Sequence, residues 1–206
     1  MSVALSVTIH LVRHGEVEDP KGIIYGRLPG YHLSERGRRQ AEGAAERLAG
    51  SDVGALWASP LERAQETAEA IAARLDVEIT TDERLVESDS SFVNFGRTLR
   101  TFARSLARSP RHWGKFTNPF RPSWGESFAD IRTRMLAAIA DAVGAADGRE
   151  VVIVSHQTPV LVARLALARR RLPPWLAFTP CETGSVTSLA LQEGKVVSAS
   201  YSRPQA

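Results

Sequence analysis

The stretch that decides the fold is EVVIVSHQTPVLVARLALA, residues 150–168. Its first half is a β-branched apolar run that ends in Ser155 and His156, and such a run predicts a buried strand. The second half predicts a helix that follows this strand directly. Strands that alternate with helices in this way are typical of a mostly parallel sheet with helices on both faces.

Similar units occupy most of the chain. The other expected elements are strands over 6–12, 53–59 and 77–80, helices over 33–50, 59–75 and 127–148, and a hairpin over 185–202 that turns at Glu193–Gly194. We therefore expect an α/β fold, a three-layer α/β/α sandwich whose mostly parallel central sheet gains an antiparallel edge strand from the hairpin. Residues 1–206 are expected to form a single domain, with a flap-like insertion at about 88–126.

Serine residues stand where three of the helices should begin. Ser34 and Ser127 are expected N-caps. Ser59 and Glu62 have the spacing of a capping box, with Pro60 at the first helical position.

Two of the expected strands end in a histidine. The first strand ends in Arg13 and His14, and the strand of residues 150–155 ends before His156. Ligands bind outside the carboxyl ends of the strands in open parallel sheets, so the fold can bring these histidines together. The second strand leads into a helix that carries Arg63 in its first turn.

Two arginines and two histidines in one place would be unfavourable in a core, because their many donors would need acceptors. They suit a tetrahedral dianion, since guanidinium groups match phosphate oxygens in a bidentate fork. Three other histidines, His10, His32 and His112, have no such motif around them and are assigned to packing or to the surface.

Three motifs together resemble the histidine phosphatase superfamily, which contains cofactor-dependent phosphoglycerate mutases and many small phosphatases. They are LVRHGE (11–16), SPLERAQETA (59–68) and VVIVSHQTP (151–159). The resemblance covers nearly the whole chain, with the motifs in the right order.

The resemblance implies a role for each matching residue. His14 is the expected nucleophile, which accepts the phosphoryl group as a phosphohistidine. Arg13, Arg63 and His156 would form the phosphate pocket, and His156 would also act in catalysis. Gly15 would let the backbone turn close to the phosphate. No metal and no cofactor are implied.

The leaving group needs a proton, and the family usually supplies it from a glutamate in a Leu-x-Glu segment. Leu85 and Glu87 match this segment, but the Gly-x-x-Glu-Gly pattern that should follow is missing. Glu87 is our choice as general acid and then as the base that activates water. Asp89 is the alternative, and a solvated loop carboxylate without function is the other interpretation.

Other departures from the family concern the substrate. Pro20 stands where mutase-like members carry an asparagine that contributes to the phosphate site. Arg27 is interpreted either as a phosphate-binding residue or as a surface residue. The chain also lacks the length of the insertions typical of glycolytic mutases, so we favour hydrolysis of a small phosphomonoester. The alternatives are a phosphoglycerate mutase and a non-catalytic phosphate-binding protein.

The positive charge of the chain is concentrated in one region. The whole chain has a formal net charge of +3, whereas the insertion holds seven basic and two acidic residues, a net +5. Aromatic residues are interleaved with these arginines, which indicates a flap that attracts an anionic substrate. No nucleic-acid-binding module is recognisable, so a small phosphate ester is the expected partner. Dimer formation is left open.

The composition indicates a cytoplasmic protein that does not enter a membrane. No apolar run approaches the roughly 18 residues of a membrane span, and the N-terminus lacks the features of a signal peptide. The single Cys181 cannot form an internal disulfide, which fits a reducing compartment.

Overall fold

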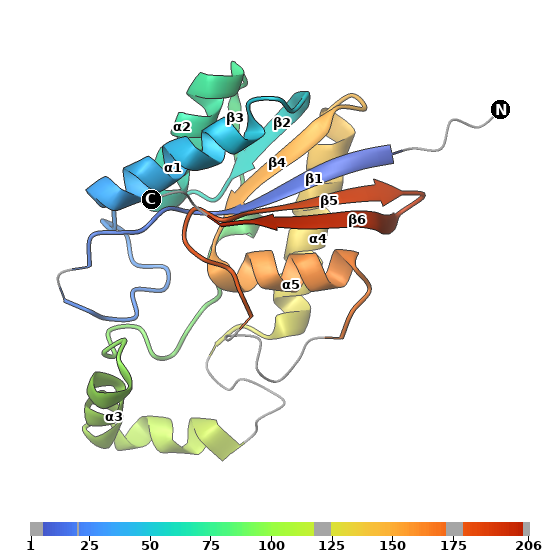
Figure 1. Ribbon diagram of the computed structural model, residues 1–206. Helices are drawn as coiled ribbons and strands as arrows, with labels where there is room; N and C mark the ends of the chain where they lie inside the picture. The colour runs from blue at the N-terminus through green and yellow to red at the C-terminus, as the bar shows by residue number, and fades with distance from the viewer. Residues whose placement is uncertain (1–5, 20, 118–124, 172–178, 204–206) are drawn as a thin grey trace.

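The computed structural model describes residues 6–19, 21–117, 125–171 and 179–203. The elements in chain order are β1 (Ser6–Arg13), α1 (Glu35–Leu48), β2 (Val53–Ala58), α2 (Glu62–Leu75), β3 (Ile79–Thr81), the 3₁₀ helix η1 (Glu83–Leu85), α3 (Leu99–Ala107), the 3₁₀ helix η2 (Pro110–Thr117), α4 (Phe128–Ala145), β4 (Glu150–Ser155), α5 (Gln157–Leu167), β5 (Val186–Gln192) and β6 (Lys195–Ser202) (Figure 1). The expected strands and helices are therefore present, with small shifts at their ends.

In the described residues the strands form one sheet in the order β3-β2-β4-β1-β5-β6. The first four of these strands are parallel to one another, whereas β5 pairs antiparallel with β1 and β6 pairs antiparallel with β5. The mostly parallel sheet is confirmed, and its antiparallel edge consists of the whole hairpin. Glu193 and Gly194 form the turn with φ values of 49° and 70°, as a two-residue hairpin turn of the primed type requires.

Helices cover both faces of this sheet (Figure 1). Val151 and Ile153 of β4 pack in one apolar cluster with residues of α4 and α5, whereas Val152 and Val154 pack in a second cluster with residues of α1 and α2. Successive side chains of a strand point to opposite faces, so a strand buried on both sides must be apolar throughout. This explains the continuous apolar run of β4 and confirms the three-layer sandwich.

The helix starts are as expected at two of the three serines. Ser34 accepts a hydrogen bond from the Gly37 N–H, and Ser127 accepts one from the Asp130 N–H. The capping-box prediction for Ser59 is wrong, because α2 begins later, after Leu61, and has no side-chain cap. The Ser59 hydroxyl is instead bonded to a histidine on another strand, as described below.

The described part of the insertion lies outside the sandwich, where α3 and η2 extend beyond the carboxyl ends of the parallel strands (Figure 1). Residues 118–124, which belong to the predicted flap, are outside the described residues. Phe92, Phe95, Phe102 and His112 pack against one another with ring centroids 5.0–5.8 Å apart. The aromatic residues of the insertion thus form a small core of their own.

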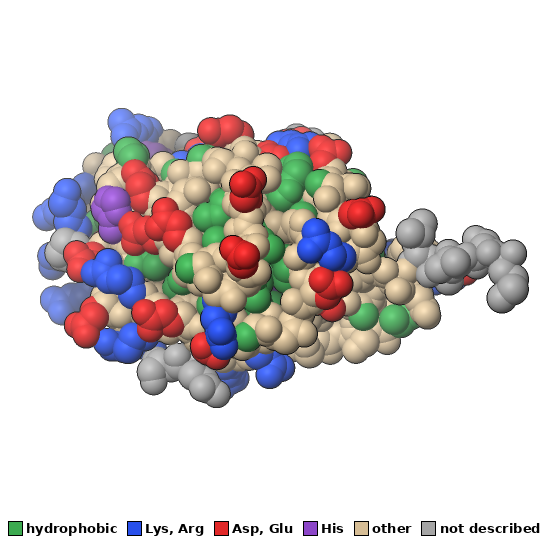
Figure 2. Space-filling view, turned by 90° about the horizontal axis from the view of Figure 1, so that it is seen from above, with side chains coloured by type: hydrophobic (Ala, Val, Ile, Leu, Met, Phe, Trp, Pro, Cys, Tyr) green, Lys and Arg blue, Asp and Glu red, His purple; other side chains and the backbone are tan. Residues whose placement is uncertain are grey.

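The surface carries both signs of charge. Seen from above, acidic and basic side chains are mixed, and basic side chains line the left edge, the end at which the parallel strands finish (Figure 2). Within the described ranges, none of the helices has the length and apolar character needed to cross a bilayer.

Candidate active site

The two strand-end histidines meet in the folded protein. β1 and β4 are parallel neighbours in which Arg13 pairs with Ser155, and the His14 N–H donates to the Ser155 carbonyl at 3.0 Å. The imidazole rings of His14 and His156 lie edge to face with their centroids 5.0 Å apart. Both residues are buried, with 2% and 0% of their surface exposed. The predicted meeting of these residues at the carboxyl end of the sheet is therefore confirmed.

The His14 imidazole has one nitrogen fixed by the backbone. Its Nδ1 lies 2.7 Å from the Gly15 carbonyl oxygen, and because a carbonyl can only accept, Nδ1 carries the proton. Burial lowers the pKa of His14 well below its usual value, and the Arg63 and Arg13 guanidinium groups lower it further. The ring is consequently neutral at pH 7, and its Nε2 carries a lone pair that can attack an electrophile.

The His156 imidazole is held by Ser59, the residue that follows β2. Its Nε2 lies 2.7 Å from the Ser59 Oγ, whereas its buried Nδ1 has no hydrogen-bond partner in the part of the chain that the structure describes. Burial lowers the pKa of His156 well below the usual value, and His14 and Arg63 add to this effect. A Ser59 hydroxyl that donates to Nε2 would place the imidazole proton on Nδ1, ready to be donated to an anion.

Arg63 is the largest fully buried side chain of the site. Its Nη2 donates to the Gly26 carbonyl at 2.7 Å, and its guanidinium carbon lies 4.9 Å from the centre of the Tyr25 ring. Its Nε and Nη1 are buried and have no hydrogen-bond partner among the described residues. Burial lowers the pKa of Arg63, while Tyr25 and Glu87 raise it. An arginine side chain stays protonated in proteins, so the group is charged and has two donors to offer.

Arg13 offers a further buried donor. Its Nη1 donates to the Cys181 carbonyl at 2.6 Å, and no described residue accepts a hydrogen bond from its buried Nε. Among the described residues neither Arg13 nor Arg63 forms an ion pair with a carboxylate. Buried charges and donors are normally paired, so this set of free N–H groups fits an anionic ligand.

Packing requires a glycine at position 15, which the sequence does not reveal. A Cβ at this position would lie 2.3 Å from the Gly37 carbonyl oxygen, so a side chain would push β1 and α1 apart. The Gly15 N–H donates to the Thr67 hydroxyl at 3.1 Å, and this hydroxyl donates to the Arg63 carbonyl at 2.7 Å. The contribution of Gly15 to phosphate binding stays a prediction, since its N–H already has an acceptor.

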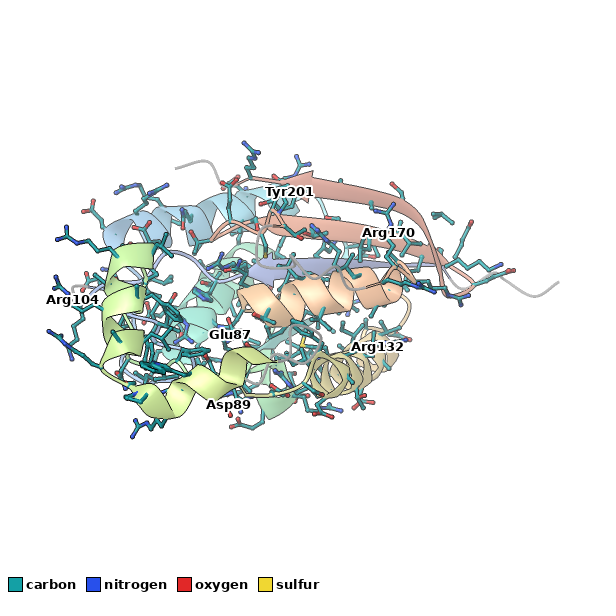
Figure 3. All side chains as sticks on the ribbon, turned by 90° about the horizontal axis from the view of Figure 1, so that it is seen from below. Glu87, Asp89, Arg104, Arg132, Arg170 and Tyr201 are labelled. Carbon is teal, nitrogen blue, oxygen red and sulfur yellow. The ribbon has the colours of Figure 1, made fainter. Side chains whose placement is uncertain are left out.

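The two candidate acids lie on the segment between η1 and α3 (Figure 3). Glu87 is half-buried and close enough to Arg63 and Tyr25 to raise the pKa of both groups. Its carboxylate accepts hydrogen bonds from the Ser88 N–H and hydroxyl at 2.7 and 3.2 Å. Asp89 is exposed. The geometry favours Glu87 over Asp89 as the carboxyl group of the site.

Arg27 is bonded to other groups than those of the histidine pocket. Its Nε donates to the Glu87 carbonyl at 2.6 Å and its Nη2 to the Glu126 carboxylate at 2.8 Å. With two of its nitrogens engaged and 41% of the side chain exposed, the guanidinium serves as a link between chain segments. Its role in phosphate binding stays a prediction. Pro20 lies outside the described residues.

Two residues of the site escaped sequence reasoning. Tyr25 contacts the Arg63 guanidinium through its ring and stacks on Tyr31, with the two tyrosine ring centroids 4.8 Å apart. It lies in a loop without periodic pattern, so no signal marked it. Ser59 was assigned to a helix cap, and only the fold shows that His156 is its partner.

The other histidines have ordinary structural partners. His10 is bonded to Ser188 and Glu150 at 2.8 Å each, His32 contacts Glu66, and His112 belongs to the aromatic core of the insertion. Within the ranges that the structure describes, no group of three or more His, Cys, Asp or Glu side chains is arranged to hold a metal ion.

Comparisons with known proteins agree with this arrangement. The family model of the histidine phosphatase superfamily (branch 1) matches residues 9–203. An uncharacterized protein of Mycobacterium tuberculosis is 48% identical over 198 residues, which are 96% of each chain. A 2,3-bisphosphoglycerate-dependent phosphoglycerate mutase of Thermoplasma acidophilum is 33% identical over 74% of this chain and 72% of its own. Among solved structures, a mycobacterial glucosyl-3-phosphoglycerate phosphatase superposes with a TM-score of 0.71 and 27% identity over 90% of both chains.

Proposed function

Because the chain belongs to the histidine phosphatase superfamily, we propose that it hydrolyses a small anionic phosphomonoester through a phosphohistidine at His14. In the first step His14 Nε2 attacks phosphorus, the P–O ester bond breaks, and the leaving oxygen takes a proton from Glu87. In the second step water attacks phosphorus, Glu87 takes its proton, and the P–N bond breaks to release phosphate. His14 thereby returns to its neutral form.

One observation carries this proposal: two neutral, buried histidines lie beside arginine donors that have neither a hydrogen-bond acceptor nor a paired carboxylate within the described ranges. The pKa of His14 is lowered by burial and by the two arginines, so the nucleophile needs no deprotonation at pH 7. The partnerless N–H groups of Arg13 and Arg63 can bind the phosphoryl oxygens. Donors that are fixed before the reaction stabilise the transition state at no cost of reorganisation.

The choice of hydrolysis over transfer rests on what the chain offers around the pocket. A mutase must shield its phosphorylated intermediate from water until the second acceptor arrives. The chain lacks the length of the insertions that are typical of glycolytic mutases and could provide this shield, which supports hydrolysis. Because a phosphoglycerate mutase is among the relatives, phosphoryl transfer is the second candidate function.

The test is the release of inorganic phosphate from a panel of phosphomonoesters, with and without a chelator, by the parent protein and by His14→Ala. The control is His32→Ala, an exposed histidine whose side chain is hydrogen-bonded to Glu66. Release that survives the chelator and the control but disappears in His14→Ala supports the proposal. Transfer between two glycerate phosphates without release would favour the mutase, and phosphate binding without either reaction would favour a non-catalytic binding protein.

A further inference from the structure

Resting on the function proposed above, we infer that Glu126 is a positioning residue, which fixes the general acid Glu87 through a clamp of two arginines. The clamp consists of Glu126, Arg27 and Arg134. Glu126 stands just before α4, and the segment that it controls is residues 84–87, the last two residues of η1 and the two that follow it.

The centre of the clamp is the Glu126 carboxylate, whose side chain is 14% exposed. Its Oε1 accepts from Arg134 Nε at 2.6 Å. Its Oε2 accepts from Arg134 Nη2 at 3.0 Å and from Arg27 Nη2 at 2.8 Å. A bidentate arginine–carboxylate pair sets both the distance and the angle between its members. One carboxylate therefore fixes the orientation of two guanidinium groups.

Each arginine uses another nitrogen to hold the backbone of the Glu87 segment. Arg27 Nε donates to the Glu87 carbonyl at 2.6 Å, and Arg134 Nη1 donates to the Arg84 carbonyl at 2.5 Å. The two ends of the four-residue segment are thus tied to the same carboxylate.

The histidine pocket supplies a third tie. The buried hydroxyl of Ser155, the residue before His156, donates to the Leu85 carbonyl at 2.6 Å. The carbonyls of Arg84, Leu85 and Glu87 are then all held from outside the segment. Because three main-chain positions are fixed, the Glu87 carboxylate can move only by rotating its own side-chain bonds.

The position of the Glu87 carboxylate depends on the position of the Glu87 backbone. Among the described residues its acceptors are used only by the N–H and hydroxyl of Ser88. These bonds lie within the same loop and do not connect Glu87 to the rest of the fold. The clamp accordingly determines where the acid stands relative to a leaving group, and a displacement of about 1 Å at a reacting group can cost about 10²-fold in rate.

The dependence of the rate on the leaving group distinguishes this role from a general structural one. An alkyl phosphate releases an alkoxide and needs a proton from the acid, whereas p-nitrophenyl phosphate releases a stable phenolate and does not. For Glu126→Gln we expect kcat/KM on the alkyl phosphate to fall by about 10- to 100-fold, because this parameter reports the steps up to release of the alcohol. The kcat/KM on p-nitrophenyl phosphate should stay close to that of the parent, whereas kcat can fall on both substrates because Glu87 also activates the water of the second step.

Two further variants complete the experiment. Arg27→Gln removes one arm of the clamp at an exposed position, and it should show the same leaving-group dependence. Arg132→Gln changes an exposed arginine of the same helix α4 that has no ion pair among the described residues, and it should leave both rates unchanged (Figure 3). Equal losses of kcat/KM on the two substrates, or no loss on either, would overturn the proposal.

A second readout separates the clamp from the proposed function. Hydrogen exchange of the amides of residues 84–88 should be faster in Glu126→Gln than in the parent, while exchange in β1 and β4 is unchanged. A parent protein that releases no phosphate would refute the proposed function, and the exchange rates would still decide whether the clamp exists. Unchanged exchange in this segment would refute the clamp itself.

Discussion

The replacement of Arg63 by lysine tests the phosphate pocket with the charge retained. Arg63 Nη2 donates to the Gly26 carbonyl at 2.7 Å, whereas Nε and Nη1 have no acceptor among the residues that the structure describes and can bind a phosphoryl group. A lysine ammonium is a compact point charge that cannot reproduce this fork at three separate positions. At least one transition-state donor is therefore lost, which costs about 2.7–4 kcal/mol, or about 10²- to 10³-fold in kcat.

The assay is the steady-state kinetics of Arg63→Lys on the best substrate of the phosphomonoester panel, with circular dichroism to show that the variant is folded. The control is Arg39→Lys, an exposed arginine paired with Glu35 at 2.8 Å, which should retain parental kinetics. Arg63→Ala, which also removes the charge, should lose both substrate binding and turnover. An Arg63→Lys protein as active as the parent would refute the assignment of the free guanidinium donors to the phosphoryl group.

Three other predictions concern the acid, the histidine pair and Ser59. Glu87→Gln should lower kcat on alkyl phosphates by about 10²- to 10⁴-fold while Asp89→Asn stays near parental activity, and the reverse order would identify Asp89 as the acid. Folding lowers the pKa values of His14 and His156 from the usual histidine value of about 6.5. Below about pH 6.5 the unfolded chain therefore binds more protons at these two residues than the folded chain does. Urea unfolding should therefore show stability falling as the pH drops below about 6.5, by at most about 1.4 kcal/mol per pH unit for each histidine, and an equally steep profile in His14→Asn would contradict this cause. Ser59→Ala removes the partner of His156 Nε2 and should lower the free energy of unfolding by about 1–3 kcal/mol, which an unchanged urea midpoint would disprove.

The sequence was sufficient for the architecture because local patterns determine it. The apolar run before His156 could only be a strand buried on both faces, and the helix after it fixed the parallel connection. Once the sheet was parallel, its carboxyl edge had to gather the residues that follow its strands. The meeting of His14 with His156 was predictable for that reason, although the distance between the rings was not.

The rest of the site depends on partners that are distant in sequence. Ser59 and His156 are 97 residues apart, and Arg27 and Glu126 are 99 apart. The capping pattern at Ser59 was a sound local inference, but the hydroxyl has a partner in the tertiary structure that no local pattern encodes. Arg27 could be interpreted as a phosphate ligand for the same reason, since its two acceptors come from separate segments.

Gly15 is a second case in which the sequence reveals only part of the reason for a residue. Its place in the motif suggests a close approach of phosphate to the backbone. The structure adds a helix whose Gly37 carbonyl leaves no room for a side chain. A motif names the residue that a site needs, but packing against an element elsewhere in the chain can require the same residue.

The most direct test of the account is to trap the covalent intermediate. The protein would be mixed with a phosphomonoester that it hydrolyses, quenched at alkaline pH, where phosphohistidine survives, and digested for mass spectrometry. We expect one added phosphoryl group on the peptide that contains His14, labile to acid and absent from His14→Asn. Rapid turnover with the phosphoryl group on another residue, or with the same turnover in His14→Asn, would contradict the central claim that His14 is the nucleophile.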